Sequence, residues 1–395
     1  MVERKAGKFN TSSVILISLA HLLHDTFGAF LAPLRPLLIE KHRLSFSLAA
    51  TLDLYQRLPS LLSPFIGLLA DRMHLRWLVI LSPGVTTVAM SLMGLAPSYL
   101  VLAVLLLVAG LSSAAFHVPT PVMVRQLSGE STGRGMSFYM LGGEVARTLG
   151  PLLITAALGI WGMEGSWRLI PFGLTASFIL YIKLRHIRVS EAILAERKKK
   201  KEGSSWSEVQ RFSRFFLILG AYLFFVAILK SGMTAFLPTY YYTDKGESLW
   251  FANTSLAILQ LAGAAGTMIS GTLSDRLGRK STLLLLAAST PLLMFFFLQS
   301  SGIYSIFFLI LLGLFLMGHT PVLLAVIQDL PSARPAFMNG IFMTLSFSIG
   351  SLAVVLNGVF ADWIGLEMMY YLGTGLALGA IPLIYWLPGK RKEKA

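Results

Sequence analysis

Long apolar runs, separated by short polar connections, recur along the whole chain. An α-helix needs about 20 mostly apolar residues to cross a bilayer, whereas a membrane β-barrel shows alternating segments of about ten residues. The runs are long and do not alternate, so they predict an all-α membrane protein with twelve transmembrane helices. The helices are expected near residues 13–38, 46–70, 77–95, 99–126, 134–160, 166–184, 213–242, 248–273, 280–299, 303–328, 335–361 and 366–387.

The composition agrees with this pattern and removes several classes of protein. Of the 395 residues, 55% are hydrophobic and 13% are charged, and the mean hydropathy is +0.70, which excludes a water-soluble fold. There is no cysteine, so disulfides, thiol catalysis and cysteine-ligated metals are excluded. The run 13–38 is too long for a cleaved signal peptide, and we expect it to be the first span.

The distribution of the basic residues explains the net charge of +14. With twelve spans, 25 of the 33 lysines and arginines fall on the side of the two termini, and only Lys41, Arg43 and Lys245 fall on the opposite side. Basic loops stay in the cytoplasm. We therefore expect a multi-pass protein of the plasma (inner) membrane with both termini cytoplasmic. Its orientation in the lipid bilayer explains the positive net charge, and nucleic-acid binding is not needed to explain it.

Two halves of the chain resemble each other on either side of a long basic connection. This connection, residues 185–212, contains the run RKKKKEGSS and is interpreted as a cytoplasmic linker. Gly67-Leu-Leu-Ala-Asp71-Arg72 recurs 204 residues later as Gly271-Thr-Leu-Ser-Asp275-Arg276, and Thr120-Pro121 recurs 200 residues later as Thr320-Pro321. The repeats predict a duplicated unit, with N-terminal and C-terminal six-helix bundles at 1–184 and 213–395.

At these loops the chain resembles the major facilitator superfamily, whose cytoplasmic signature runs GxLxDRxGRK. The second copy, from Gly271 to Lys280, matches in full, whereas the first copy has His74 and Leu75 in place of a glycine and an arginine. Further motifs are similar to the fosmidomycin resistance branch of drug exporters. They are His21-x3-Asp25, Phe116-His117 followed by Pro119, Gly142-Gly143 and Gly150-Pro151.

The resemblance implies the major facilitator fold, in which two pseudo-symmetric six-helix bundles face a cavity and alternate between inward-open and outward-open states. The loop residues are then expected to form a cytoplasmic latch, although a plain turn with solvated charges is the alternative. Gly150 and Pro151 bend helix 5 or merely allow close packing. The gating residues expected on this basis are Asp71, Arg72, Asp275, Arg276, Arg279, Gly150 and Pro151.

Charged residues inside the spans are the candidates for transport chemistry, because such residues normally face protein or water. Asp25 is the leading proton carrier, with His21 one turn away and His24 adjacent. The alternative for both histidines is hydrogen bonding to helix backbone. The spacings allow Asp53 to pair with Arg57, and Glu144 with Arg147, on their own helices, and purely structural pairs are the alternative to a role in transport. The residues expected to line a substrate cavity are Gln56, Arg57, Asp53, His117, Glu144, Arg147, Lys230, Gln260 and His319.

The expected function is transport driven by a gradient, because the chain has neither an ATP-binding GxxxxGK[ST] nor an HExxH motif. No enzyme activity, cofactor or metal site is expected, and a monomer contains everything that the fold requires. The leading hypothesis is proton-coupled export of a small polar or amphiphilic organic compound. An uptake symporter on the same fold is the alternative, and a non-transporting receptor or an intramembrane enzyme belongs to a different class.

Overall fold

The computed structural model describes residues 9–62, 75–185, 210–331 and 335–387. Within these ranges the chain is helical and contains no strand. Eleven helices of the described chain are long and apolar enough to span a membrane. The span predicted at 46–70 begins as α3 (Phe46–Arg57) and a 3-10 turn, η1 (Leu58–Leu62), before it leaves the described residues. The prediction of an all-α, twelve-helix membrane protein is confirmed.

The helices of the N-terminal half follow the predicted spans within a few residues, with breaks inside spans 1 and 4. Short 3-10 turns, η2 (Met93–Leu95), η3 (Gly129–Ser131) and η4 (Glu164–Leu169), lie between helices. The α-helices besides α3 are α1 (Thr11–Gly28), α2 (Leu31–His42), α5 (Leu75–Ser91), α6 (Tyr99–His117), α7 (Thr120–Ser128), α8 (Thr132–Trp161) and α9 (Ile170–Leu184).

The helices of the C-terminal half show the same order and a similar break in the tenth span. A π-turn, η5 (Tyr240–Asp244), extends the first of them, and a 3-10 turn, η6 (Ile384–Trp386), ends the last. The α-helices are α12 (Ser213–Thr239), α13 (Leu249–Leu277), α14 (Arg279–Gln299), α15 (Gly302–Leu316), α16 (His319–Gln328), α17 (Pro335–Ile364), α18 (Leu366–Ala377) and α19 (Ala380–Leu383).

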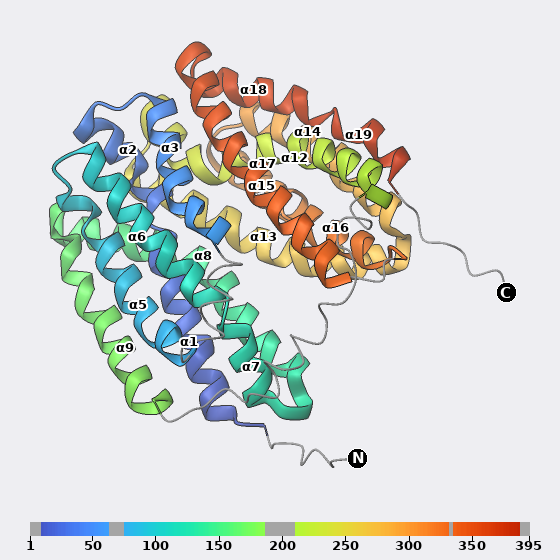
Figure 1. Ribbon diagram of the computed structural model, residues 1–395. Helices are drawn as coiled ribbons and strands as arrows, with labels where there is room; N and C mark the ends of the chain where they lie inside the picture. The colour runs from blue at the N-terminus through green and yellow to red at the C-terminus, as the bar shows by residue number, and fades with distance from the viewer. Residues whose placement is uncertain (1–8, 63–74, 186–209, 332–334, 388–395) are drawn as a thin grey trace, which may run out of the picture. The chain divides into compact units, whose positions relative to one another are not determined.

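The same neighbours recur in the packing of each half (Figure 1). In the first half α1 packs on α8, and α5 packs on α6 and α9. In the second half α12 packs on α17, and α14 packs on α15 and α18. These pairs correspond helix by helix, so the pseudo-symmetry inferred from the sequence repeats is present in the structure.

The fourth and tenth spans both break just before their Thr-Pro pair. Helix α6 ends at His117, and α7 begins at Thr120 with Pro119 as its N-cap residue. Helix α15 ends at Leu316, and α16 begins at His319, with Thr320 and Pro321 in its first turn. Proline lacks a backbone N–H and is therefore tolerated where the N–H groups of a new helix have no partner. The break leaves a histidine at the junction in each half.

The chain divides into two compact units, and one short segment of the N-terminal half belongs to the unit formed by the C-terminal half. One unit contains Met1–Leu34 and Leu52–Glu202, and the other contains Arg35–Thr51 and Gly203–Ala395. In the second unit Asp362 of α17 accepts hydrogen bonds from the backbone N–H groups of Phe46 (2.6 Å) and Ser47 (2.9 Å), at the start of α3. A carboxylate at that position satisfies unpaired donors and complements the helix dipole.

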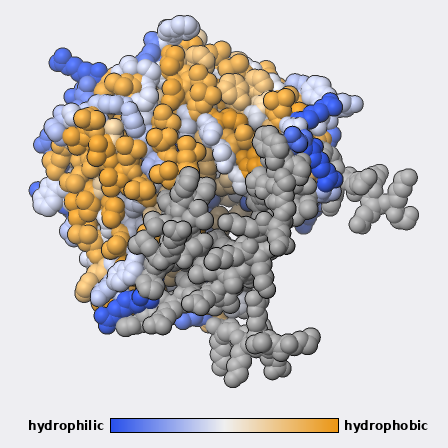
Figure 2. Space-filling view, viewed as in Figure 1, coloured by the Kyte–Doolittle hydropathy of each residue, from blue (hydrophilic) through white to orange (hydrophobic). Residues whose placement is uncertain are grey.

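Many large apolar side chains are exposed on the helices, as a lipid-facing surface requires. Figure 2 shows apolar residues over most of the described surface on the face in view. Leu100, Ile160, Leu217, Ile303 and Trp363 are among the most exposed. Apolar patches of this extent are rare on soluble monomers. They agree with a multi-pass integral membrane protein.

Candidate functional site

Glycines of α8 bring this helix close to α1. A Cβ atom at Gly142 would lie 2.6 Å from the carbonyl oxygen of Ser18, and one at Gly150 would lie 2.6 Å from the Cβ of Ala29. A Cβ at Gly143 would lie 2.7 Å from Cε1 of His21. Small residues permit such an approach of two membrane helices. Close packing is therefore what the structure shows for this stripe, while a gating role for Gly150 and Pro151 stays a prediction.

Three side chains of the first unit meet at one point beside this contact. Nε2 of His21 lies 3.1 Å from Oδ2 of Asp25, one turn away on α1. Nε2 of His117, at the end of α6, lies 3.3 Å from Oδ1 of the same carboxylate. The two Nε2 atoms lie 3.2 Å from each other. Sequence reasoning placed His117 in the substrate cavity, whereas the structure joins it to Asp25 and His21.

Backbone carbonyl groups determine which nitrogen of each ring carries hydrogen. Nδ1 of His21 donates to the carbonyl oxygen of Tyr139 at 2.7 Å, and the two rings stack with centroids 4.0 Å apart. Nδ1 of His117 donates to the carbonyl oxygen of Ser113 at 2.9 Å. A carbonyl oxygen only accepts, so each Nδ1 bears the hydrogen. In the neutral form of each ring, Nε2 is then a lone-pair acceptor.

The arrangement brings together three electron-rich groups with no hydrogen between them when both rings are neutral. Two Nε2 lone pairs and one carboxylate then face one another at 3.1 to 3.3 Å. Such a group of acceptors is stable only when a positively charged species lies among them, because a buried acceptor without a donor is costly. The cluster is therefore a candidate site for one cation. Its side chains are 6% (His21), 21% (Asp25) and 38% (His117) exposed, so it opens on the side of His117.

His24, which was predicted to join Asp25 and His21 in a proton relay, packs beside this cluster, with its ring centroid 5.5 Å from that of His117. The side chain is buried and stacks on Phe116, with ring centroids 4.6 Å apart. The group of metal-binding type that the described residues contain consists of His21, Asp25 and His117. His24 is therefore part of the packing around the cluster, and its place in a proton relay stays a prediction.

The ion pair predicted on α8 is present but is not buried. Nη1 of Arg147 lies 3.1 Å from Oε2 of Glu144, and the two side chains are 54% and 27% exposed, respectively. The contact predicted within α8 is therefore present. Glycines occupy the side of α8 that faces α1, and the charged pair lies on an open side. Charges inside a span are tolerated where they reach water.

Three other predicted polar residues of the first unit belong to α3. Gln56 donates from Nε2 to the carbonyl oxygen of Gly28 at 2.8 Å, at the break between α1 and α2. Asp53 is buried in α3, and Arg57 is the last residue of that helix. The pairing of Asp53 with Arg57 stays a prediction, as does the place of all three residues in a substrate cavity.

The second unit holds a different set of polar groups. Nζ of Lys230 on α12 lies 3.4 Å from Oγ1 of Thr320 on α16. His319 is buried and donates from Nδ1 to the carbonyl oxygen of Leu316 at 3.2 Å. Gln260 is half-buried on α13. Their place in a substrate cavity stays a prediction.

The loop between α13 and α14 is organised around Arg279. Its Nη1 lies 2.6 Å from Oδ1 of Asp275, and its Nε lies 3.0 Å from Oδ2 of Asp329, at the end of α16. Gly278 has φ +90°, a conformation that favours glycine, and begins α14. Asp275 thus has an arginine partner, whereas Arg276 lies exposed at the end of α13. Asp71 and Arg72 of the first copy lie outside the described residues, and the latch stays a prediction for both copies.

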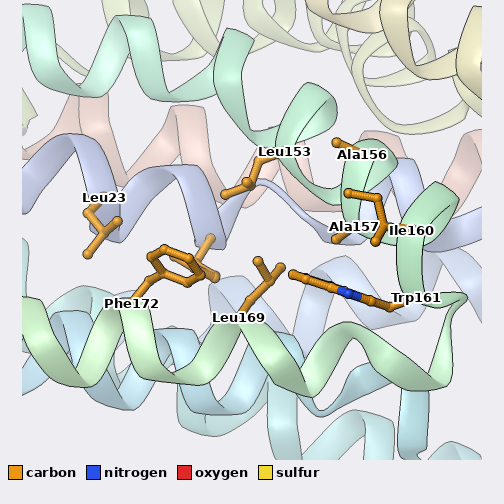
Figure 3. Close-up of a pocket in the computed structure, with 9 residues that line it drawn as sticks. Leu23, Leu153, Ala156, Ala157, Ile160, Trp161, Leu169 and Phe172 are labelled. Atoms are coloured by element: carbon orange, nitrogen blue, oxygen red, sulfur yellow. The ribbon is translucent and has the colours of Figure 1, made fainter.

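An apolar pocket of about 200 Å³ lies in the first unit, apart from the charged cluster. Figure 3 shows side chains of α1, α8 and the η4–α9 segment that surround it. Its lining contains no charged residue and consists of Leu23, Phe27, Leu153, Ala156, Ala157, Ile160, Trp161, Leu169 and Phe172. Ile160 and Phe172 are 71% and 60% exposed. The pocket thus opens onto the apolar surface and offers no polar group for orienting a substrate.

Sequence reasoning missed Tyr139 and Ser113, whose carbonyl groups set the tautomers of the cluster. No residue type marks a backbone carbonyl, so the sequence carries no signal for them. It also missed Asn357 of α17, which is fully buried and donates from Nδ2 to the carbonyl oxygen of Ile228 at 2.8 Å and to Oγ of Ser231 at 3.0 Å. A lone asparagine in an apolar span was the available signal, since such residues bind neighbouring helices.

A twelve-helix protein with duplicated bundles and a charged cluster within its spans has the architecture of a membrane transporter and not of an enzyme. The model of the Major Facilitator Superfamily matches residues 17–354, and the chain belongs to this family of transporters. The fosmidomycin resistance protein of Escherichia coli (strain K12) is 26% identical over 401 residues, which cover 98% of this chain and 95% of that protein. The resemblance to that branch is thus supported along almost the whole chain.

Solved structures show the same fold at lower identity. A bacterial homologue of the human lysosomal transporter Spinster, in an inward-facing and occupied conformation, matches with a TM-score of 0.75 at 16% identity, covering 96% of this chain and 94% of that chain. A D-xylose–proton symporter matches with a TM-score of 0.71 at 14% identity, covering 98% of this chain and 100% of that chain. At these identities the likeness concerns the fold alone.

Proposed function

We propose that this protein is a secondary active transporter that exports a small polar or amphiphilic organic compound in exchange for protons, as a monomer in the plasma membrane with both termini in the cytoplasm. The transport cycle is alternating access between two conformations of the duplicated bundles. Protons enter and leave through the cluster of His21, Asp25 and His117, and the exported compound is drug-like.

The observation that carries this proposal is the convergence of three acceptors within the spans. With both Nδ1 hydrogens donated to the carbonyl groups of Tyr139 and Ser113, a proton on either Nε2 lies between that ring and the Asp25 carboxylate. Such a proton is shared at 3.1 or 3.3 Å. In the proposed cycle α6 moves relative to α1, which separates His117 from Asp25 and weakens the site. One conformation therefore holds the proton more firmly than the other, and this difference is what couples a gradient to transport.

Two further findings support export over uptake. A relative that matches 98% of this chain is named for resistance to fosmidomycin, and export of a compound from the cell is one way to gain resistance to it. A Gly-Pro pattern in the fifth span is associated with antiporters in this superfamily, and Gly150-Pro151 in α8 matches it in part. The exposed Glu144–Arg147 pair on the same helix offers both charges to a polar compound.

The test is proton-driven flux in proteoliposomes that contain Asp25→Asn. Asparagine keeps the shape of the side chain and cannot carry the proton between the two imidazoles. We expect flux driven by an imposed pH gradient to fall to the level of protein-free vesicles, while binding of the transported compound is retained. A ligand screen by thermal shift on the purified protein supplies that compound.

Asp244→Asn is the matched control, because Asp244 lies at the end of the π-turn with an exposed side chain hydrogen-bonded by Thr243. It makes the same chemical change outside the cluster and leaves flux unchanged. Undiminished gradient-driven flux in Asp25→Asn would contradict the proposal. Flux that requires substrate and proton gradients in the same direction would identify the uptake symporter instead.

A further inference from the structure

The distances within the cluster of His21, Asp25 and His117 are those of a metal site. A tetrahedral metal with bonds of about 2.0 to 2.1 Å to nitrogen and oxygen places its ligand atoms about 3.3 Å apart. The two Nε2 atoms lie 3.2 Å apart, and the carboxylate oxygens lie 3.1 and 3.3 Å from them. Each Nε2 atom thus lies at such a spacing from the other Nε2 and from one carboxylate oxygen, which is Oδ2 for His21 and Oδ1 for His117.

The orientation of both rings is also that of metal-binding histidines. Such histidines donate their other N–H to a carbonyl or carboxylate group, which fixes the tautomer and the direction of the lone pair. His21 does so toward Tyr139, and His117 does so toward Ser113. The stacking of His21 on Tyr139, with an interplanar angle of 15°, further restricts the ring. The ligands are therefore held in position before any ion arrives.

We propose that the cluster also binds one divalent transition-metal ion, of the kind represented by Zn²⁺, at the place that the proposed function gives to the proton. Two imidazole nitrogens and one carboxylate suit zinc and its first-row neighbours, whereas Mg²⁺ and Ca²⁺ prefer oxygen ligands alone. Three protein ligands leave the fourth position for water on the open side of the cluster, where His117 is 38% exposed. No metal was expected from the sequence, because the third ligand, His117, is far from the other two along the chain.

Binding of the ion does not depend on the proposed function, but its consequence for transport does. A divalent ion among the three ligands excludes the shared proton and ties α6 to α1 through His117. Zn²⁺ therefore inhibits gradient-driven flux of the wild-type protein. Binding without any inhibition would place the ion away from the proton and overturn that part of the proposal.

The direct test is calorimetric titration of the full chain with Zn²⁺ in detergent, after removal of any polyhistidine tag. We expect one ion per chain. Co²⁺ in place of Zn²⁺ gives a visible absorption spectrum that distinguishes four-coordinate from six-coordinate binding, and the four-coordinate spectrum is expected. No binding by the wild type, or a six-coordinate spectrum, would overturn the proposal.

Variants assign the ion to the cluster. His117→Ala or Asp25→Ala removes a ligand and should raise the Kd at least about 100-fold, beyond the 10- to 100-fold typical of an outer-shell partner. His117→Gln serves where the alanine variant fails to fold, and it gives the same loss. Gly143→Ala keeps all three ligands but displaces the His21 ring, since its Cβ would lie 3.0 Å from Nε2, and should weaken binding less.

His319→Gln is the matched control, because His319 occupies the corresponding junction in the other half and belongs to no such group among the described residues. Its Kd should equal that of the wild type. Equal affinity in the wild type and His117→Ala would show that the ion binds elsewhere, and the proposal would be wrong. These measurements need no gradient, so they stand or fall separately from the flux test of Asp25→Asn.

Discussion

His117 and His319 occupy corresponding places in the two halves, and their surroundings differ in one decisive respect. Each lies where its span breaks before a Thr-Pro pair, and each donates from Nδ1 to a backbone carbonyl in the preceding turn. Nε2 of His117 faces the Asp25 carboxylate and a second imidazole. His319 instead lies 6.0 Å from the Tyr222 ring, close to the helix turn that carries Lys230.

The comparison separates the features that both halves share from those that only one half has. The helix break, and the hydrogen bond from the histidine Nδ1 to a backbone carbonyl oxygen, occur in both halves. The anionic partner occurs only beside His117 among the residues that the structure describes. We infer that the first unit carries the cation site and that the second unit contributes a positively charged region around Lys230.

The contact between corresponding helices also differs between the halves. The glycines of α8 let its backbone approach α1 closely. In the second half the contact between α12 and α17 is made by a side chain, since Asn357 binds Ile228 and Ser231. Backbone contact leaves no freedom for larger residues, whereas a side-chain contact tolerates a change of helix spacing.

The largest difference is expected when each of the two junction histidines is replaced by glutamine in a separate variant. His117→Gln removes one acceptor from the shared proton, which costs about 1.5 to 3 kcal/mol for a hydrogen bond to a charged group, or roughly 10- to 150-fold in occupancy. Gradient-driven flux should fall accordingly. His319→Gln should leave the ratio of flux with and without a gradient unchanged. Equal losses in both variants would mean that the two junctions have the same role.

A smaller effect is expected from filling the close contact on α8. Gly143→Ala should lower the free energy of unfolding by about 1 to 3 kcal/mol, because the new methyl group overpacks the fixed His21 ring. Gly159→Ala on the same helix meets nothing within 4 Å and should instead raise it by about 0.5 to 1 kcal/mol. Denaturant unfolding followed by helical circular dichroism measures both. A stabilised Gly143→Ala variant would show that α1 and α8 have room to separate.

The smallest effect is expected from the exposed ion pair of α8. A double-mutant cycle with Glu144→Ala and Arg147→Ala should give a coupling energy of at most about 1 kcal/mol, as for other exposed pairs. Thermal unfolding of the two single variants and the double variant supplies the values. A coupling well above that figure would show that the pair becomes buried in another conformation.

The fold was predictable because membrane spans are a matter of length and hydropathy. The predicted segment 99–126, for example, corresponds to a span at 99–128. The site was only half predictable. His21 and Asp25 lie one turn apart on one helix, so their spacing alone brings them together. His117 reaches them through packing of α6 and α1, and local spacing contains no information about that contact.

The exposure of Glu144 and Arg147 could not be predicted, for a related reason. Hydropathy locates a residue within a span but does not say which side of the helix faces water, lipid or protein. On α8 that choice is made by Gly142 and Gly143, whose missing side chains draw one side of the helix against α1. The charged side is then left open.

The assignment of Arg35–Thr51 to the second unit has a consequence for how the protein is made. Arg35 is fully buried and lies over the ring of Phe236, 4.8 Å from its centroid, while Asp362 binds the start of α3. Both partners are synthesised long after the segment that they hold. During biogenesis the first two spans must therefore enter the membrane with part of their final surroundings missing. Residues 35–51 therefore reach these contacts only after α12 and α17 have been synthesised.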